Sequence, residues 1–419
     1  MSNAINDPRI ADLFAHNANT PAASEDPVKR AIQVIRKHLG MDVAYVSEFV
    51  DDRIVFREVD APGLEAMIKP GDSHSLDDVY CRHILAGTIP ELMPDTSKVP
   101  EAVKLPITAA LPIGSHISVP IRLADGECYG MFCCLSFDAD QSLNGRDLSM
   151  MKAFSELASF EIDRNVQRER QIAIKTDRIS EILNSGLIEI YHQPICDLST
   201  REPIGFEALS RFSSSPTRSP DKWFAEADEV NQRVALEIAA IVKALPTLPM
   251  VPEDTYLSVN VSPETLLCSE LADILSLSSL DRIVLEITEQ MPIIDYDAIN
   301  AALSPLRKQG MRLAVDDAGA GHASLKHIFQ LNPDIIKFDM SLTRDLDKDP
   351  VRQVLIGALV SFCRDTDTTI VGEGVETEAE LDALSKLGVT SGQGYLLGRP
   401  APAAHHAAQP EERKLLSFA

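Results

Sequence analysis

The second half of the chain alternates short apolar segments with amphipathic helical segments, and this alternation limits the fold more than any other feature. Such a pattern predicts a mostly parallel sheet or a closed barrel. About eight strands within about 225 residues suit an α/β fold of the (β/α)8 barrel type. The expected strands are 187–191, 203–209, 256–261, 282–287, 311–315, 334–338, 369–371 and 393–396, and the expected helices include 229–244, 296–309, 351–364 and 378–387.

Polar side chains stand at or near the ends of most of these strands. In a barrel of this type, strand ends and the loops after them form the active site. A single carboxylate at a strand end is usually a helix cap or a surface group. Several carboxylates on one rim would repel one another without cations, and their oxygens suit Mg²⁺ or Mn²⁺. The polar residues are Glu207, Asn260, Glu286, Asp316, Asp317, Lys337, Glu373 and Gln393. Adjacent aspartates can serve two ions, an arrangement known for phosphoester hydrolysis.

The segments around these residues resemble, in order, the motifs of the EAL family of cyclic di-GMP phosphodiesterases. The tripeptide Glu207-Ala208-Leu209 matches the signature that names the family, but it is weak alone because its residues are common. The stronger matches are SVNVS at 258–262, LEITE at 285–289, VDD at 315–317, PDIIK at 333–337, GEGVET at 372–377 and QGY at 393–395. The resemblance covers roughly residues 182–406 and implies a TIM-like barrel of the EAL type.

This resemblance implies hydrolysis of cyclic di-GMP to linear 5′-pGpG with two divalent ions, Mg²⁺ or Mn²⁺, per EAL domain. The implied metal ligands are Glu207, Asn260, Glu286, Asp316, Asp317 and Glu373, and the implied catalytic residues are Lys337, Glu373, Glu207 and Asp317. Gln193, Arg211 and Gln393 would bind the substrate, since an Arg fork suits a pair of phosphate oxygens. Glu289 would stabilise a loop through backbone N–H groups rather than bind metal.

The loop after Asp317 departs from the family pattern. Ala318, Ala320 and His322 stand where the family usually has an aromatic residue, a threonine and another aromatic residue. The two glycines between them still allow a tight backbone. In this family the loop links metal binding to the dimer interface, so we expect the departure to affect rate or regulation rather than the chemistry. His322 is interpreted as a surface or loop-packing residue, not a metal ligand.

A second hypothesis is a catalytically silent receptor that binds cyclic di-GMP and signals through protein contacts. Silent members of the family typically lack metal ligands or the lysine. This chain has all of them, which favours the enzyme. A diguanylate cyclase is not supported, because the sequence has no Gly-Gly-Asp/Glu-Glu-Phe segment.

The first half predicts an α+β domain with an antiparallel sheet. An apolar helical stripe begins at Pro27, and strand pairs follow at 43–50 with 53–59 and at 116–123 with 127–137. Residues 26–160 resemble a GAF domain through the segments 80–81, 94–96, 118–121 and 129–130. GAF domains sense varied small molecules or dimerise. Cys81 and His83 are candidate contacts to an unknown ligand, and the alternative for Cys81 is a packed small hydrophobe.

No helix breaker occurs from residue 146 to about residue 183, which predicts a helix of about 55 Å. Its apolar spacing indicates a connector that pairs with its twin in a homodimer, and the alternative is one helix packed on its own domain. The expected organisation is a flexible tail (1–25), a GAF-like sensor (26–160), a helical linker (161–181), an EAL domain (182–406) and a C-terminal tail (407–419).

Composition limits partners and location. The formal net charge of −24 disfavours nucleic acid polymers and anionic membranes. No apolar run reaches the length of a membrane-spanning helix, and residues 1–9 do not resemble a secretory signal. The seven cysteines are scattered, which argues against a disulfide framework or a thiolate zinc site and favours the cytoplasm.

Overall fold

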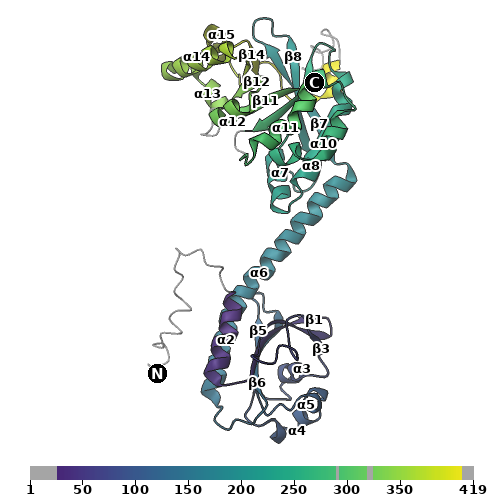
Figure 1. The fold of residues 1–419 in the computed structure, drawn as a ribbon, viewed down its shortest axis with the longest axis vertical. Helices are drawn as coiled ribbons and strands as arrows, with labels where there is room; N and C mark the ends of the chain where they lie inside the picture. Colours follow the sequence, from purple (N-terminus) through teal and green to yellow (C-terminus); the bar gives the residue numbers. More distant parts are fainter. Residues whose placement is uncertain (1–25, 289–291, 319–323, 408–419) are drawn as a thin grey trace. The chain divides into compact units, whose positions relative to one another are not determined.

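The computed structural model describes residues 26–288, 292–318 and 324–407. These residues form two compact units that are divided between Gln171 and Ile172 (Figure 1). We call them unit 1 and unit 2. Helix α6 (Gly145–Ser185) contains the boundary, and its 41 residues agree with the long helix expected from residue 146. The expected domain limits at 160, 181 and 406 stay predictions. The expected tails lie outside the described residues, apart from Ala407.

Unit 1 contains a six-stranded sheet in which neighbouring strands run antiparallel, in the order β3-β2-β1-β6-β5-β4. This architecture confirms the expected α+β fold. Its strands are β1 (Val43–Val50), β2 (Arg53–Asp60), β3 (Ser73–Ser75), β4 (Leu92–Met93), β5 (Ser115–Arg122) and β6 (Cys128–Ser136).

Helices cover both faces of this sheet (Figure 1). Successive residues of a strand point to opposite faces. Thus Ala44 and Val46 pack with helix α2 (Pro27–Leu39) and α6, whereas Val43 and Tyr45 pack with α3 (Tyr80–Leu85). The second face is completed by α4 (Pro100–Val103), α5 (Pro106–Ala110) and the 3-10 turn η1 (Thr96–Lys98).

Unit 2 is a closed barrel of eight strands, β7 to β14, because β14 also pairs with β7. The (β/α)8-like barrel expected from the sequence is therefore confirmed. Strands β8 to β14 run parallel, and β7 alone runs antiparallel to both of its neighbours. The strands are β7 (Ile188–Asp197), β8 (Pro203–Phe212), β9 (Tyr256–Asn260), β10 (Ile283–Thr288), β11 (Arg312–Ala318), β12 (Ile335–Phe338), β13 (Thr369–Gly372), β14 (Ser391–Gln393) and the added β15 (Ala401–Pro402).

Helices surround the barrel, and their apolar faces form the core with the outward-facing strand residues. The helices and 3-10 turns are α7 (Pro220–Glu229), α8 (Arg233–Ala244), η2 (Leu245–Met250), α9 (Pro263–Leu266), α10 (Ser269–Leu275), η3 (Leu280–Arg282), α11 (Tyr296–Arg307), α12 (Ser324–Leu331), α13 (Met340–Thr343), η4 (Leu346–Lys348), α14 (Pro350–Asp365), α15 (Glu378–Leu387) and α16 (Ala403–Ala407).

Three sequence expectations were wrong in detail. The helix expected at 229–244 begins only at Arg233, because Asn231, with the left-handed φ of 56°, separates α8 from the end of α7 at Glu229. The first strand extends to Asp197, well beyond the expected residue 191. The eighth strand ends at Gln393 instead of beginning there, since Gly394 turns away against the backbone of Val375.

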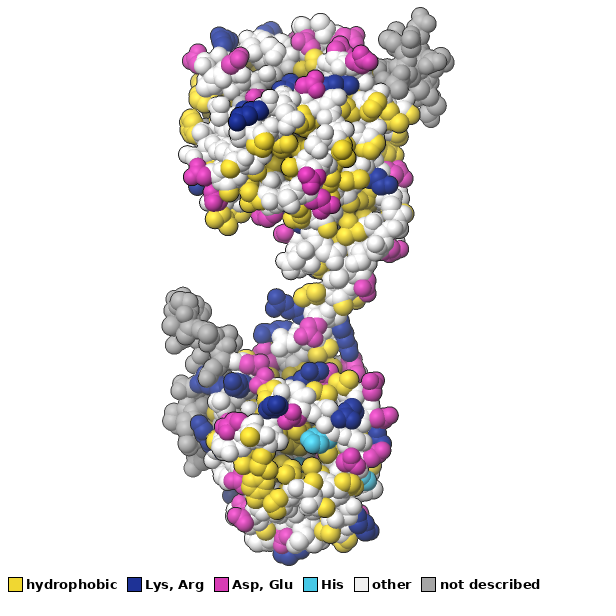
Figure 2. Space-filling view, turned by 45° about the vertical axis from the view of Figure 1, so that its right-hand side comes forward, with side chains coloured by type: hydrophobic (Ala, Val, Ile, Leu, Met, Phe, Trp, Pro, Cys, Tyr) yellow, Lys and Arg dark blue, Asp and Glu magenta, His cyan; other side chains and the backbone are white. Residues whose placement is uncertain are grey.

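Acidic and basic side chains are interspersed over the surfaces that Figure 2 shows. Within the described ranges, we find no helix whose length and apolar character would let it cross a membrane.

Candidate active site

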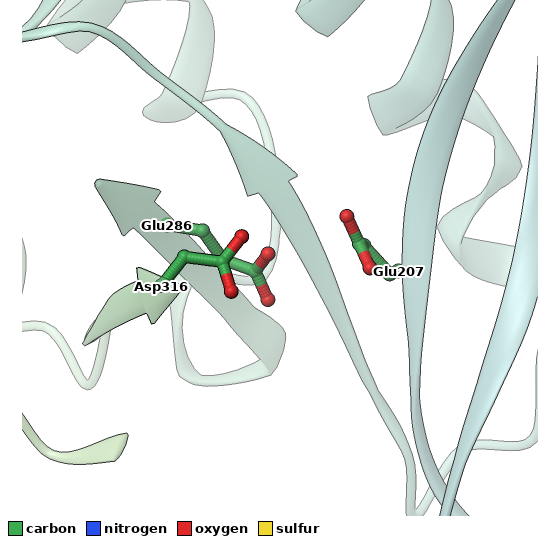
Figure 3. A group of neighbouring side chains, drawn as sticks. All are labelled: Glu207, Glu286 and Asp316. Carbon is green, nitrogen blue, oxygen red and sulfur yellow. The ribbon is translucent and has the colours of Figure 1, made fainter. Parts of the chain in front are cut away.

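Polar side chains from neighbouring strands converge at the mouth of the barrel. Glu207 lies on β8, Glu286 on β10 and Asp316 on β11, and their carboxylates face one another (Figure 3). The register explains this convergence: Asn260, the last residue of β9, pairs with Glu286, whose strand pairs in turn with β11. Because the carboxyl ends of parallel strands meet at one rim, residues scattered over the sequence form one cluster.

Lys337 on β12 is the centre of this cluster. Its Nζ atom lies 2.8 Å from Glu373, 2.9 Å from Glu286, 3.1 Å from Asp316 and 3.3 Å from Glu207. The lysine side chain is 1% exposed. Four carboxylates therefore share one buried ammonium group.

Three amide side chains complete the wall beside Glu207. Asn260 Nδ2 donates a hydrogen bond of 2.9 Å to one Glu207 oxygen, and Gln393 Nε2 donates one of 2.7 Å to the other. Gln393 Nε2 also lies 3.1 Å from Gln193 Oε1, and Gln193 donates to the Gly398 carbonyl. Gln193 and Gln393, which were expected to bind substrate, are thus buried parts of the carboxylate cluster.

A backbone irregularity lets both aspartates of β11 contribute to the site. Residues next to each other in a regular strand point to opposite faces. Here Asp317 has φ 57°, and the pairing of β11 with β12 shifts register between Val315 and Ala318. Oxygens of Asp316 and Asp317 consequently lie within 4.8 Å of each other and of a Glu373 oxygen. Left-handed non-glycine residues of this kind occur often at functional sites.

Burial and mutual repulsion weaken the acidity of several carboxyl groups. Burial raises the pKa of Glu286 to about 8, and the charges of Glu207 and Asp316 add to the shift, while Lys337 opposes it. Burial, together with Asp316 and Asp339, raises the pKa of Asp317 to about 6. These carboxylates would gain stability from additional positive charge.

The pKa values of Glu207 and Lys337 shift in the direction opposite to the one that burial alone would cause. Burial alone would raise the pKa of Glu207, but the Lys337 charge and the hydrogen bonds from Gln393 and Asn260 hold it below its ordinary value. Burial alone would lower the pKa of Lys337, but the surrounding carboxylates raise it well above the usual value. Lys337 therefore stays charged and serves as the internal counter-ion.

The described residues fit a pair of divalent cations. Glu207, Glu286 and Asp316 form one group of oxygens within 4.8 Å of one another, and Asp316, Asp317 and Glu373 form a second. Asp316 belongs to both groups. One lysine balances five carboxylates only in part, and the Oε1 atom of Gln393 is buried with no hydrogen-bond partner among the described residues. Oxygen donors of this kind suit Mg²⁺ or Mn²⁺.

Residues 176–400, more than half of the chain, match the family model described as EAL domain. The chain belongs to the EAL domain family. A relative in Escherichia coli strain K12, "Probable cyclic di-GMP phosphodiesterase PdeA", is 28% identical over 64% of this chain and 37% of the relative. A second from the same strain, "Probable cyclic di-GMP phosphodiesterase PdeI", is 30% identical over 54% of this chain and 30% of the relative. The chain thus spans well under half the length of these curated relatives.

The EAL domain is also similar to the solved structure described as "PaMucR Phosphodiesterase, c-di-GMP complex". The TM-score is 0.50 at 27% identity, and the match covers 55% of this chain and 98% of that one.

Among the described residues, Arg211 forms no ion pair with the carboxylates around Lys337. Its guanidinium donates to the Ser210 carbonyl and stands 5.5 Å from the centre of the Tyr191 ring. With Asn260 and Thr288 it lines a cavity of about 400 Å³ whose other walls come from β7, β8, α7 and α8. Glu289 and the loop positions 319–322, including His322, lie outside the described residues.

The backbone bulge at Asp317 was not predicted from the sequence. The glycines at positions 319 and 321 were the sequence feature that could have indicated it. Glu237, a buried carboxylate on α8 that lines the same cavity as Arg211, was not predicted either. The signal for Glu237 was an acidic residue within an otherwise apolar helical stripe.

Proposed function

We propose that the chain hydrolyses one phosphodiester bond of cyclic di-GMP and releases linear 5′-pGpG. The observation that carries this proposal is the complete cluster of carboxylates, amides and one lysine at the mouth of an EAL barrel. The names of the two Escherichia coli relatives and the cyclic di-GMP complex of the similar solved structure support the choice of substrate.

Two divalent ions, Mg²⁺ or Mn²⁺, fit this proposal. Glu207, Asn260, Glu286 and Asp316 would hold one ion, and Asp316, Asp317 and Glu373 would hold the other. When bound, such a pair activates water and stabilises the charge that develops on the phosphodiester oxygens. Lys337 offsets part of the carboxylate charge, and its ammonium group would help to orient the attacking water.

The surroundings of the cluster provide room for a dinucleotide. Arg211 offers a planar fork for phosphate oxygens. The 400 Å³ cavity beside it lies within the range of small-molecule sites and joins apolar walls to Asp221, Arg233 and Asn260. Gln393, whose amide donates to Glu207, and Gln193, which accepts from Gln393, would assist binding at the cluster.

The decisive experiment is incubation of the purified full chain with cyclic di-GMP and Mg²⁺ or Mn²⁺, followed by chromatography. The proposal expects conversion to pGpG. Retained binding of cyclic di-GMP without product under either ion would instead support the silent receptor.

We also propose that unit 1 is a GAF-like sensor that regulates the EAL domain. A cavity of about 340 Å³ lies on the sheet face covered by α3 and α5, and Cys81 and His116 line it. His116 is 2% exposed, and its Nδ1 atom has no hydrogen-bond partner in the part of the chain described. His83 does not line this cavity and instead contacts Thr88. A ligand that binds here should raise the melting temperature, and Ala110→Trp, which fills the cavity, should abolish the increase.

A homodimer and a cytoplasmic location complete the proposal. Phe160 and Ile174, two heptads apart on one face of helix α6, are 69% and 49% exposed, which is consistent with pairing of two such helices. Light scattering of the full chain tests the dimer. The scattered cysteines favour a reducing compartment.

A further inference from the structure

Helix α8 buries one carboxylate beside the site. Glu237 is 6% exposed, and its neighbours Ile238 and Ile241 belong to the barrel core. A carboxylate in such surroundings is costly unless both of its oxygens are paired. A position of this kind therefore needs a reason beyond packing.

Both Glu237 oxygens have a partner. One accepts a hydrogen bond of 2.9 Å from Arg233 Nε, one turn earlier on α8. The other accepts a hydrogen bond of 2.8 Å from the backbone N–H of Ser262. Ser262 is fully buried, so Glu237 is the group that satisfies this N–H.

Ser262 lies two residues after Asn260, at the turn from β9 into α9. Its hydroxyl accepts from the Thr265 backbone N–H and caps α9. Val261, which lies between Asn260 and Ser262, donates its N–H to the Glu286 carbonyl at 2.9 Å. The turn is thereby held from two sides, by β10 within the barrel and by Glu237 on the helix outside it.

We propose that Glu237 is a positioning residue for the metal site and acts through Asn260. Its carboxylate fixes the 260–262 turn so that the Asn260 amide meets Glu207 with its nitrogen at 2.9 Å and presents its oxygen for an ion. This inference rests on the proposed function. It implies that a helix outside the barrel contributes to metal affinity, in addition to the residues at the strand ends.

Glu226 on α7 provides a matched control. It is 5% exposed, it lies on a helix that packs outside the barrel, and it pairs with Arg218 at 2.8 Å and Arg178 at 3.2 Å. Glu226 and Glu237 therefore share burial, charge and an arginine partner, and they differ in the contact to the turn after Asn260.

The test measures Mn²⁺ binding to the full chain by calorimetry and by electron paramagnetic resonance, in addition to turnover. Glu237→Gln keeps the size of the side chain but leaves only one acceptor oxygen for two donors. It should weaken Mn²⁺ binding by about 10-fold, the lower end of what loss of the outer contacts that orient metal ligands costs, because Glu237 acts on Asn260 through the turn. Glu226→Gln should leave Mn²⁺ affinity within about 2-fold, because it lacks that connection.

A double-mutant cycle separates positioning from a merely structural role. If Glu237 acts through Asn260, Glu237→Gln should weaken Mn²⁺ binding little further in an Asn260→Ala background. Additive losses, or an equal loss of affinity in Glu226→Gln, would overturn the inference. A wild-type chain that binds Mn²⁺ but produces no pGpG would reject the proposed hydrolysis, and the Mn²⁺ affinities would still decide the role of Glu237.

Discussion

The two units bury polar groups in different ways. Among the described residues of unit 1, the buried polar side chains are serines, a threonine and His116, without a buried Asp, Glu, Lys or Arg. The described part of unit 2 buries Lys337 and the carboxylates of Glu207, Glu226, Glu237, Glu286, Asp316 and Glu380. The described core of unit 1 is uncharged. Unit 2 buries charged side chains, which are costly unless they have a function or dedicated partners.

The buried carboxylates of unit 2 fall into two classes. Glu226 and Glu237 pair with arginines, and Glu380 accepts three backbone N–H groups, each at 3.0 Å. Burial would raise the pKa values of Glu226 and Glu380, but these donors hold them below the ordinary value. At the barrel mouth, by contrast, carboxylates face one another around a single lysine. The first class is fully paired within the fold, whereas the second has fewer positive charges than carboxylates and can bind cations.

The largest expected effect follows from removing the shared lysine or a shared ligand. Lys337→Ala and Glu207→Ala should each lower kcat by at least about 100-fold, because each removes a group that organises the charged cluster. Turnover of cyclic di-GMP is measured by chromatography, and circular dichroism checks that the variant is folded. Full activity in either folded variant would show that the site is misassigned.

Removal of divalent ions should affect the barrel mouth strongly and unit 1 little. Chelation should abolish turnover. Restoring Mn²⁺ at 100 times its Kd should stabilise the barrel by about 2.7 kcal/mol, since only the folded site binds the ion. Calorimetric unfolding with and without Mn²⁺ measures this gain, and Glu207→Ala supplies the control that should lose it. An equal gain in that variant would contradict binding at this cluster.

Two matched neutralisations test the two classes directly. Glu226→Gln should lower the free energy of unfolding by about 2 kcal/mol, because it removes charge-assisted hydrogen bonds, while kcat stays near the wild-type value. Glu286→Gln should abolish turnover at little cost in stability, because two of its neighbours are themselves carboxylates. Denaturant titration measures the stability of both variants, and chromatography measures their turnover. Loss of turnover in Glu226→Gln with loss of stability in Glu286→Gln would contradict the two classes.

The smallest effect is expected from the sensor. Deletion of residues 1–160 should change the turnover rate of the EAL domain a few-fold, because a regulatory unit shifts a population rather than supplying catalytic groups. The measurement compares rates and oligomeric states of the two chains. Identical values in both would remove the regulatory proposal.

Much of this site could be predicted because its strands are locally encoded. Each strand is a short apolar run, and a polar residue at its end must reach the same rim as the others. Glu207, Glu286, Asp316 and Lys337 were located on this basis, and the structure brings the three carboxylates into contact with Lys337. The reversed direction of β7 was not foreseen, although the short connection from β7 to β8 is typical of an antiparallel pair.

The sequence by itself determined the order of the elements, the closed barrel and the residue types that gather at its mouth, because hydrophobic periodicity and strand ends are local properties. The tertiary structure alone decided how those residues work together. The bulge that turns Asp316 and Asp317 to one side depends on pairing with β12. The contact of Glu237 with Ser262 joins a helix to the turn after β9, 25 residues further along the chain. Such features arise from contacts between distant segments, which no local pattern records.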